Sequence, residues 1–468
     1  MTTQYFGDID AAKEDSKLLS DYFIAHPIFE RVEKEKNDRP TIVVGVKGAG
    51  KTALGRVVFE RFNGLKWFRD EFTRSYGFDV PENLHPSGKL LKSVRVFLLN
   101  QFIAALVHKG DIKEDKWTKL KTSLKQIGAK VAKSTEVSVG VMKFNPAKLL
   151  DVSNEEHSDD AWEDSIKLLK EELGGKSALM VIDDVDSYFP GIESSPRFIE
   201  GLFRAIREIN DIKDLKIYCL LLVKQGVWRR LFENQEEYDR VKKSVDFLSW
   251  NIDNCAAVLS GRIAQIHNMD FKKRPQKLAN TTKYLKREFS GGTATETQTC
   301  FKRVFELSVN GPRDVIDLCN LVKKTYPDEK ISISNIDDCL PKYSEEKLYG
   351  INQDFGHIYP DLPKFLNRAF SGFKTEFKGS ELAAYLEDED GILIDPKAEH
   401  MAFGRHSWFM DTSAGGIVKI LFDIGVVGVV RKEGPAVFSN EDNSLSQNAL
   451  IGSCLIVHNA YRHALGLQ

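Results

Sequence analysis

The residues best suited to chemistry lie in the segment GVKGAGKT, residues 45–52, which matches the pattern G-x-x-x-x-G-K-[ST]. Its glycines permit positive φ and let backbone N–H groups come close to phosphate oxygens. Lys51 could reach the β and γ phosphates of a nucleotide, and the Thr52 hydroxyl could ligate Mg²⁺. A glycine turn that only joined a strand to a helix would need neither group. The pattern therefore predicts a nucleotide-binding loop made of Gly45, Lys47, Gly48, Ala49, Gly50, Lys51, Thr52 and Ala53.

An acidic pair follows an apolar run later in the chain. The segment LMVIDDVD, residues 179–186, is typical of a buried strand that ends in Asp183 and Asp184. Because ligands bind at the carboxyl ends of strands in parallel sheets, we expect Asp183 to hold Mg²⁺. Asp184 would orient or deprotonate the attacking water and, with Lys51, forms the predicted catalytic pair. Surface acids after a strand, or a pseudo-ATPase that only binds nucleotide, are the alternatives; the intact pair favours hydrolysis.

A third element is the segment VNGPRDVIDL, residues 309–318, in which Pro312 and Arg313 open a helix. The guanidinium of Arg313 has a fork of donors that could reach back to a γ-phosphate. A solvated arginine at a helix start is the plainer interpretation. We include Arg313 among the predicted nucleotide-binding residues.

The elements that must position these residues follow an α/β pattern. Apolar strands are predicted at residues 41–46, 177–184 and 216–223, and helices at 52–62, 162–173 and 196–210. Helices that alternate with continuously apolar strands predict a parallel sheet covered on both faces. From residue 252 to 343 the pattern is only helical, as in a lid beside such a sheet.

The last part of the chain has its own pattern. Helical stretches at 362–370, 380–386 and 414–422 precede the short strands VVGVV and AVFS, and CLIVHNAYRHAL closes the chain as a strand and a helix. Helices followed by a small hairpin predict a winged-helix domain. The expected domains are therefore a P-loop core at 1–250 with a helical, lysine-rich insertion at about 109–160, a helical lid at 251–345, and a winged-helix-like domain at 350–468.

Composition excludes several classes of protein. The chain has 468 residues, 42% hydrophobic and 29% charged, with a net charge of -2. Six cysteines without a C-x-x-C pair indicate reduced thiols and not a disulfide framework or a zinc site. The most apolar long window, residues 415–430, is interrupted by Lys419 and Asp423 and is too short to cross a bilayer. We therefore expect a cytoplasmic protein that does not bind membranes.

Charge also bears on nucleic acid as a partner. Residues 351–468 contain 10 lysines and arginines against 15 aspartates and glutamates, the wrong sign for phosphate contacts. The predicted recognition helix at 413–422 offers only Lys419. DNA could still contact the lysine-rich stretch at 109–134, although a solvated helix face is the more ordinary interpretation.

Taken together, the segments GVKGAGKT, VIDDVD, CLLLVKQGVWRRL and NGPRDVIDLCNLV resemble STAND-class and AAA+-like ATPases, including the KAP and NACHT groups. The opening YFGDIDAAKED and the closing LFDIGVVGVV and LIVHNAYRHAL are similar to bacterial P-loop ATPases that end in a winged helix. The resemblance implies a P-loop NTPase core with a helical lid. It also implies that Lys51 and Thr52 contact phosphate and Mg²⁺, that Asp183 and Asp184 are the acid pair, and that Arg313 is the arginine after glycine-proline.

The chain departs from this family at one sensor position. Where the family often has an arginine just after the fourth strand, this chain has Lys224, which offers a point charge in place of a fork. Either γ-phosphate sensing at Lys224 is weaker or the lysine is simply solvated. The second acid is Asp, as is usual in the switch-like branch, whose members tend to hydrolyse slowly and to use the bound nucleotide to set their assembly state.

These observations favour a nucleotide-controlled switch that binds ATP with Mg²⁺ and hydrolyses it slowly. The expected partners are ATP and either further copies of the chain or a separate effector protein, as in bacterial antiphage defence or signalling. An effector would be separate because the chain leaves almost no room before residue 41 for a fused nuclease, protease or NADase. The alternative is a DNA-associated AAA+ ATPase, and a kinase with the same loop is a third class.

Overall fold

The computed structural model describes the chain in segments. They comprise residues 4–8, 13–14, 19, 27–33, 41–69, 136–138, 141–143, 163, 166–167, 169–171, 173–183, 195–232, 242–271, 277–309, 311–356, 358–370, 372–387, 407–439 and 445–467. Asp184 and the lysine-rich stretch at 109–134 lie outside the described residues.

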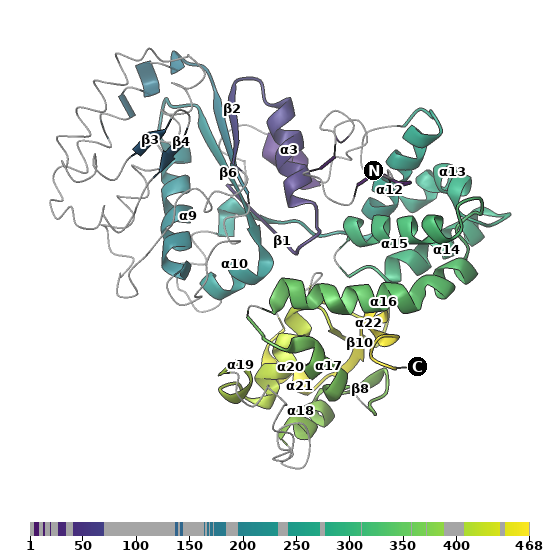
Figure 1. Ribbon diagram of the computed structural model, residues 1–468. Coiled ribbons are helices and arrows are strands. Elements are labelled where there is room, and N and C mark those ends of the chain that lie inside the picture. Colours follow the sequence, from purple (N-terminus) through teal and green to yellow (C-terminus); the bar gives the residue numbers. More distant parts are fainter. Residues whose placement is uncertain are drawn as a thin grey trace.

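The first half of the chain contains a five-stranded parallel sheet (Figure 1). Its strands are β1 (Ile42–Gly45), β2 (Leu65–Arg69), β5 (Ala178–Ile182), β6 (Ile217–Lys224) and β7 (Val245–Phe247), in the order β2-β5-β6-β1-β7. Every residue of β1 and β5 is buried, which explains their continuous apolar runs. The predicted α/β class with a parallel sheet is confirmed. The edge strand β2, which pairs with β5, was not predicted.

Helices cover both faces of this sheet. On one side lie α2 (Pro27–Glu33) and α3 (Lys51–Arg61), and on the other lie α9 (Ser195–Asp211) and α10 (Gln225–Phe232) (Figure 1). Side chains from alternate strand positions, such as Val43, Leu220 and Leu222, share a core with Leu54 of α3. A separate two-stranded sheet pairs β3 (Glu136–Ser138) with β4 (Val141–Lys143).

A helical region follows the sheet. Its helices are α12 (Ile252–Ile266), α13 (Leu278–Glu288), α14 (Ala294–Glu306), α15 (Pro312–Thr325) and α16 (Ile333–Phe355). Local sequence sets their starts: Asn251 caps α12, capping boxes begin α14 and α16, and Pro312 occupies the first turn of α15. Among the described residues, no helix is long and apolar enough to cross a membrane.

The C-terminal region contains short helices around a three-stranded antiparallel sheet. The elements are α17 (Leu362–Ala369), β8 (Glu376–Lys378), α18 (Gly379–Glu387), α19 (Ser407–Met410), α20 (Ala414–Asp423), β9 (Val427–Val429), α21 (Gln447–Ile451), β10 (Cys454–Val457) and α22 (Asn459–Arg462). Strand β10 lies between β8 and β9, and Val429 also bridges to Val437. The three predicted helices and the predicted closing strand are therefore present.

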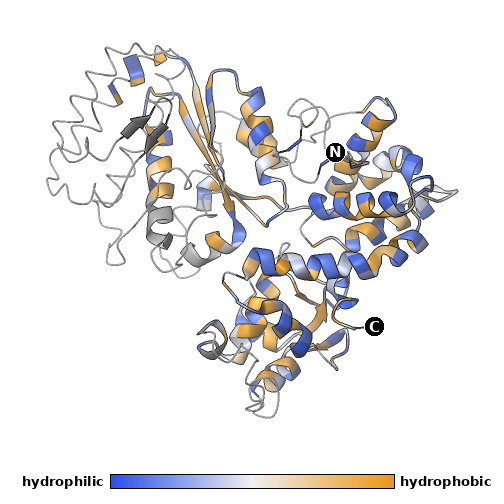
Figure 2. Cartoon of the chain, viewed as in Figure 1, coloured by the Kyte–Doolittle hydropathy of each residue, from blue (hydrophilic) through white to orange (hydrophobic). Residues whose placement is uncertain are grey.

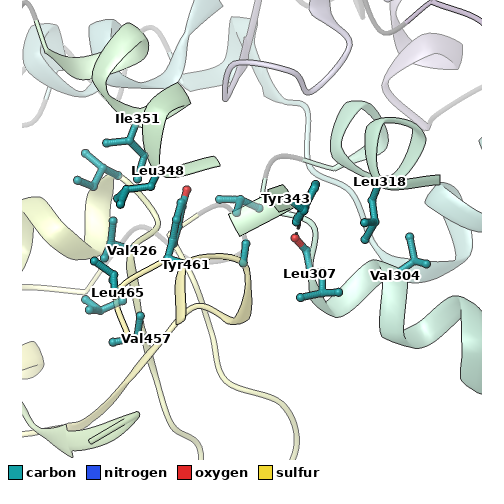
Figure 3. Close-up of a cluster of buried hydrophobic side chains, with 14 of the residues drawn as sticks. Val304, Leu307, Leu318, Tyr343, Leu348, Ile351, Val426, Val457, Tyr461 and Leu465 are labelled. Atoms are coloured by element: carbon teal, nitrogen blue, oxygen red, sulfur yellow. Dashed lines mark hydrogen bonds between the residues drawn. The ribbon is translucent and has the colours of Figure 1, made fainter. Parts of the chain in front are cut away.

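One hydrophobic core extends from the helical region into the C-terminal region. Apolar residues recur along the helices of both regions (Figure 2). Figure 3 shows the junction between the two regions, where Tyr343 of α16 donates a hydrogen bond to the Leu307 carbonyl (3.1 Å). Leu348 and Ile351 of α16 lie beside Tyr461 and Leu465. Helix α16 thus runs unbroken through the domain boundary expected at residues 345–350, and that boundary stays a prediction.

A buried ionic cluster fixes α15 against α16. Lys347 of α16 contacts Asp314 (2.9 Å) and Asp317 (3.0 Å) of α15, and Asp314 also accepts from the Val309 N–H. Burial by itself lowers the pKa of Lys347, but the two carboxylates outweigh it and raise the net pKa. The lysine therefore remains charged and holds the two helices together.

His458 supplies a pH-sensitive contact in the C-terminal region. Its Nδ1 accepts the Ala460 N–H (3.1 Å) at the start of α22, and burial lowers the pKa of His458 to about 4 despite the nearby Asp314. The unfolded chain takes up this proton near pH 6.5, whereas the folded chain does not until about pH 4. Stability is therefore lost as pH falls through that window.

We expect the C-terminal region to lose up to about 3 kcal/mol of stability between pH 7 and pH 4 through His458 alone. His458→Asn keeps a side-chain acceptor at the start of α22 but cannot titrate. The pH dependence of the urea midpoint, followed by intrinsic tryptophan fluorescence, should be shallower in this variant. Equal pH dependence in both proteins would contradict the role of His458.

Candidate phosphate-binding site

The loop between β1 and α3 has positive φ at two of the three glycines where the sequence predicts it; Gly45, the last residue of β1, does not adopt it. Gly48 (φ 85°) and Gly50 (φ 88°) adopt the left-handed conformation, which favours glycine. Gly45 is needed for space, because a Cβ there would lie 3.3 Å from the Cβ atoms of Ala49 and Leu248. The loop therefore wraps tightly around the start of α3, where the helix dipole favours anions.

Lys51, the first residue of α3, directs its ammonium into this loop. Its Nζ donates hydrogen bonds to the carbonyls of Gly45 and Val46, both at 2.9 Å. The same ammonium can pair with an anionic oxygen, which is a stronger acceptor than a neutral carbonyl. Ala53 lies half-buried in the same first turn of α3.

Thr52 and Asp183 meet at the carboxyl edge of the sheet. The Thr52 hydroxyl donates a hydrogen bond to Oδ2 of Asp183 at 2.6 Å, although 131 residues separate them. Asp183 is 5% exposed and directly follows β5. A hydroxyl and a carboxylate are hard oxygen ligands of the kind that Mg²⁺ binds beside nucleotide phosphates. These two side chains therefore fit the predicted magnesium site.

The two sensor candidates occupy different places. Lys224 ends β6 and is the register partner of Gly45, so it lies beside the first residue of the loop. Arg313 is in the first turn of α15 and half-buried. Gly311, two residues before Arg313, packs against Trp250, and Trp250 in turn donates a hydrogen bond to the loop. The structure thus brings Lys224 to the loop directly, and it joins the start of α15 to the loop through Trp250.

Trp250 is a site residue that sequence reasoning missed. Its indole Nε1–H donates a hydrogen bond to the Ala49 carbonyl at 2.6 Å. The tryptophan comes three residues after β7 and directly before Asn251, the N-cap of α12. Its position at the exit from the last strand was the only available signal.

Two further contacts join the carboxyl edge of the sheet to distant parts of the chain. This edge, with the loop between β1 and α3, is called the phosphate edge below. The loop residue Lys47 forms an ion pair with Asp354, near the end of α16. Gln225, directly after Lys224, donates a hydrogen bond to the Ser439 carbonyl of the C-terminal region (3.2 Å). The two pairs are separated by 307 and 214 residues, so no local pattern could predict them.

The parallel sheet, the loop and the Thr52–Asp183 contact together fit a P-loop NTPase. Comparison with protein-family models gave no match, and comparison with curated proteins gave none either. Among solved structures, the chain is similar to the Walker-type ATPase PABY2304 of Pyrococcus abyssi. The TM-score is 0.43 and the identity 11%, over 95% of this chain and 96% of that one.

The loop geometry predicts binding of a polyphosphate that depends on Lys51. Pyrophosphate with Mg²⁺, at about 100 times its dissociation constant, should stabilise the protein by about 2.7 kcal/mol and raise its melting temperature. Lys51→Ala should remove most of this rise. Lys66→Ala is the matched control, since Lys66 donates to the Glu60 carbonyl away from the loop. An equal thermal shift in both variants would argue against the site.

Proposed function

We propose that this chain binds ATP with Mg²⁺, hydrolyses it slowly and uses the bound nucleotide as a conformational switch. The observation that carries the ATPase part is the 2.6 Å contact between Thr52 and Asp183 beside Lys51. A structural turn would not require a buried carboxylate against the helix-start hydroxyl. The three side chains come from α3 and from the end of β5.

Each residue then has a defined task. The loop N–H groups and Lys51 hold the phosphates, and Thr52 and Asp183 would ligate Mg²⁺, which neutralises charge on the phosphate oxygens when bound. Asp184, which follows Asp183 in the sequence, is proposed as the general base that orients the attacking water. Lys224 and Arg313 are proposed to report the γ-phosphate, Lys224 from beside Gly45 and Arg313 from the start of α15.

The switch part is supported by the contacts between the phosphate edge and the second half of the chain. Asp354 places a carboxylate on Lys47, within the loop that would hold phosphate. An incoming phosphate competes with this carboxylate for the ammonium and repels it as a like charge. Nucleotide binding would therefore loosen α16 from the loop. Because α16 shares its core with the C-terminal region, that region would move with it.

The C-terminal region is proposed to be a winged helix that docks on protein and not on DNA. Its helix order and three-stranded sheet support this assignment. The only lysine of α20, Lys419, forms an ion pair with Asp423 of the same helix (2.6 Å), which neutralises the charge that a DNA contact would use. We propose assembly into a homo-oligomer or recruitment of a separate effector. A role in antiphage defence rests on the resemblance to STAND-class ATPases alone.

Phosphate release from ATP, combined with mass photometry, tests the proposed function. We expect Mg²⁺-dependent release that falls by at least about 100-fold in Lys51→Ala and Asp183→Asn, because both remove transition-state stabilisation. Assembly should appear with ATP and not with ADP, and should be lost in Lys51→Ala. A wild-type protein that releases no phosphate and binds no ATP would contradict the proposal. A monomer in every state would contradict only its assembly part.

The Lys47–Asp354 pair gives a separate prediction. Asp354→Asn removes the competing carboxylate and should tighten ATP binding about two- to fivefold, the range expected for one partly exposed ion pair. Asp361→Asn is the matched control, because it alters an ion pair with Lys364 on α17. Isothermal titration calorimetry measures the affinities. Unchanged or weaker binding in Asp354→Asn would show that the ion pair does not compete with nucleotide.

A further inference from the structure

We propose that Trp250 is a positioning residue for phosphate binding, which holds the Ala49–Gly50 peptide through its indole N–H and links this peptide to Gly311 through its ring. The inference deepens the proposed ATPase function and rests on it. Trp250 would act through the loop and not on the nucleotide itself. It would make nucleotide affinity depend on the position of α15.

Trp250 Nε1 donates a hydrogen bond to the Ala49 carbonyl (2.6 Å). A trans peptide is planar, so its C=O and the following N–H point in opposite directions. By holding the Ala49 carbonyl on one side, the indole fixes the Gly50 N–H on the other. Gly50 is the left-handed residue directly before α3, and its N–H belongs to the group that a phosphate loop turns toward its anion.

The Ala49 side of this peptide is buried. Ala49 is fully buried, and its own N–H donates to the Val46 carbonyl (3.2 Å), so the loop is held on both sides of Ala49. A buried carbonyl that loses its donor must reorient or stay unsatisfied, at a cost in stability. Reorientation of the Ala49 carbonyl would turn the Gly50 N–H as well. The loop would then lose one of its phosphate donors.

The indole ring of Trp250 contacts the start of α15. Gly311 has φ 90° and ψ -136°, and a Cβ there would lie 2.9 Å from Cδ1 and 3.0 Å from Cγ of Trp250. The ring therefore packs directly on the Gly311 backbone, with no room for a side chain. Pro312 and Arg313 follow at once. If α15 moves, either the indole ring is displaced with it or the contact between Gly311 and the ring is lost.

The backbone around Trp250 is tied to the sheet as well. The Leu248 N–H donates to the Val44 carbonyl of β1 (2.7 Å), and Asn251 caps α12 through the Asn254 N–H. Trp250 therefore stands where the sheet, the phosphate loop and the first turn of α15 meet. Because coupling between two sites is reciprocal, a phosphate that orders the loop also favours the packed position of α15.

The test uses the full chain with ATP and Mg²⁺. Trp250→Phe keeps an aromatic ring against Gly311 but removes the N–H donor, and it should weaken ATP binding about tenfold, as for the loss of one partly buried hydrogen bond. Trp228→Phe is the matched control, since Trp228 is buried on α10 among other aromatic side chains. Gly311→Ala should also weaken ATP binding, because it pushes the ring away from the loop.

Tryptophan fluorescence reports whether ATP changes the surroundings of Trp250. ATP should change the tryptophan emission of the wild type and of Trp228→Phe, and this change should be lost in Trp250→Phe at saturating ATP. If Trp250→Phe and Gly311→Ala bind ATP as tightly as the wild type, the inference is overturned while the proposed function stands. If the wild type binds no ATP, the proposed function itself is overturned.

Discussion

The backbone of the phosphate loop imposes the constraint on which the rest of the site depends. A loop that turns several N–H groups toward one point must turn the matching carbonyls away from it, because each peptide is planar. Positive φ at Gly48 and Gly50 makes that arrangement accessible. The outward Ala49 carbonyl then needs a partner in a buried setting, and it finds the indole of Trp250. Holding an anion and docking the helical region are thus parts of one arrangement.

The helical and C-terminal regions are held together by burial and by charge. The Lys347 ammonium between Asp314 and Asp317 fastens α16 to α15, and breaking such a buried pair from one side is costly. Leu348, the residue after Lys347, and Ile351, one turn beyond Lys347 on α16, extend the same core into the C-terminal region. The contacts of Trp250 and Asp354 with the loop therefore join the loop to one packed body.

Several features followed from local patterns. The apolar runs predicted β1, β5 and β6, because strands buried on both faces cannot tolerate polar positions. Thr52 and Asp183 were each predicted to lie at the carboxyl edge of the sheet, because parallel strands end at a common edge. Their direct contact was not predicted. The edge strand β2 was missed because its sequence, LKWFR, contains two charged residues in five and follows α3 after a short turn. Asp184 lies outside the described residues, so its role as a base stays a prediction.

The sequence by itself determined the loop, its glycines, its lysine and the class of sheet that carries it, because these depend on backbone conformation and on periodic burial within short segments. Only the tertiary structure decided that Trp250 holds Ala49, that Asp354 pairs with Lys47, and that Gln225 contacts Ser439. An aspartate near a helix end has the same local pattern whether it faces water or a lysine 307 residues away. Such pairs are set by how elements distant in the sequence pack together, which hydrophobic burial drives and no local pattern encodes.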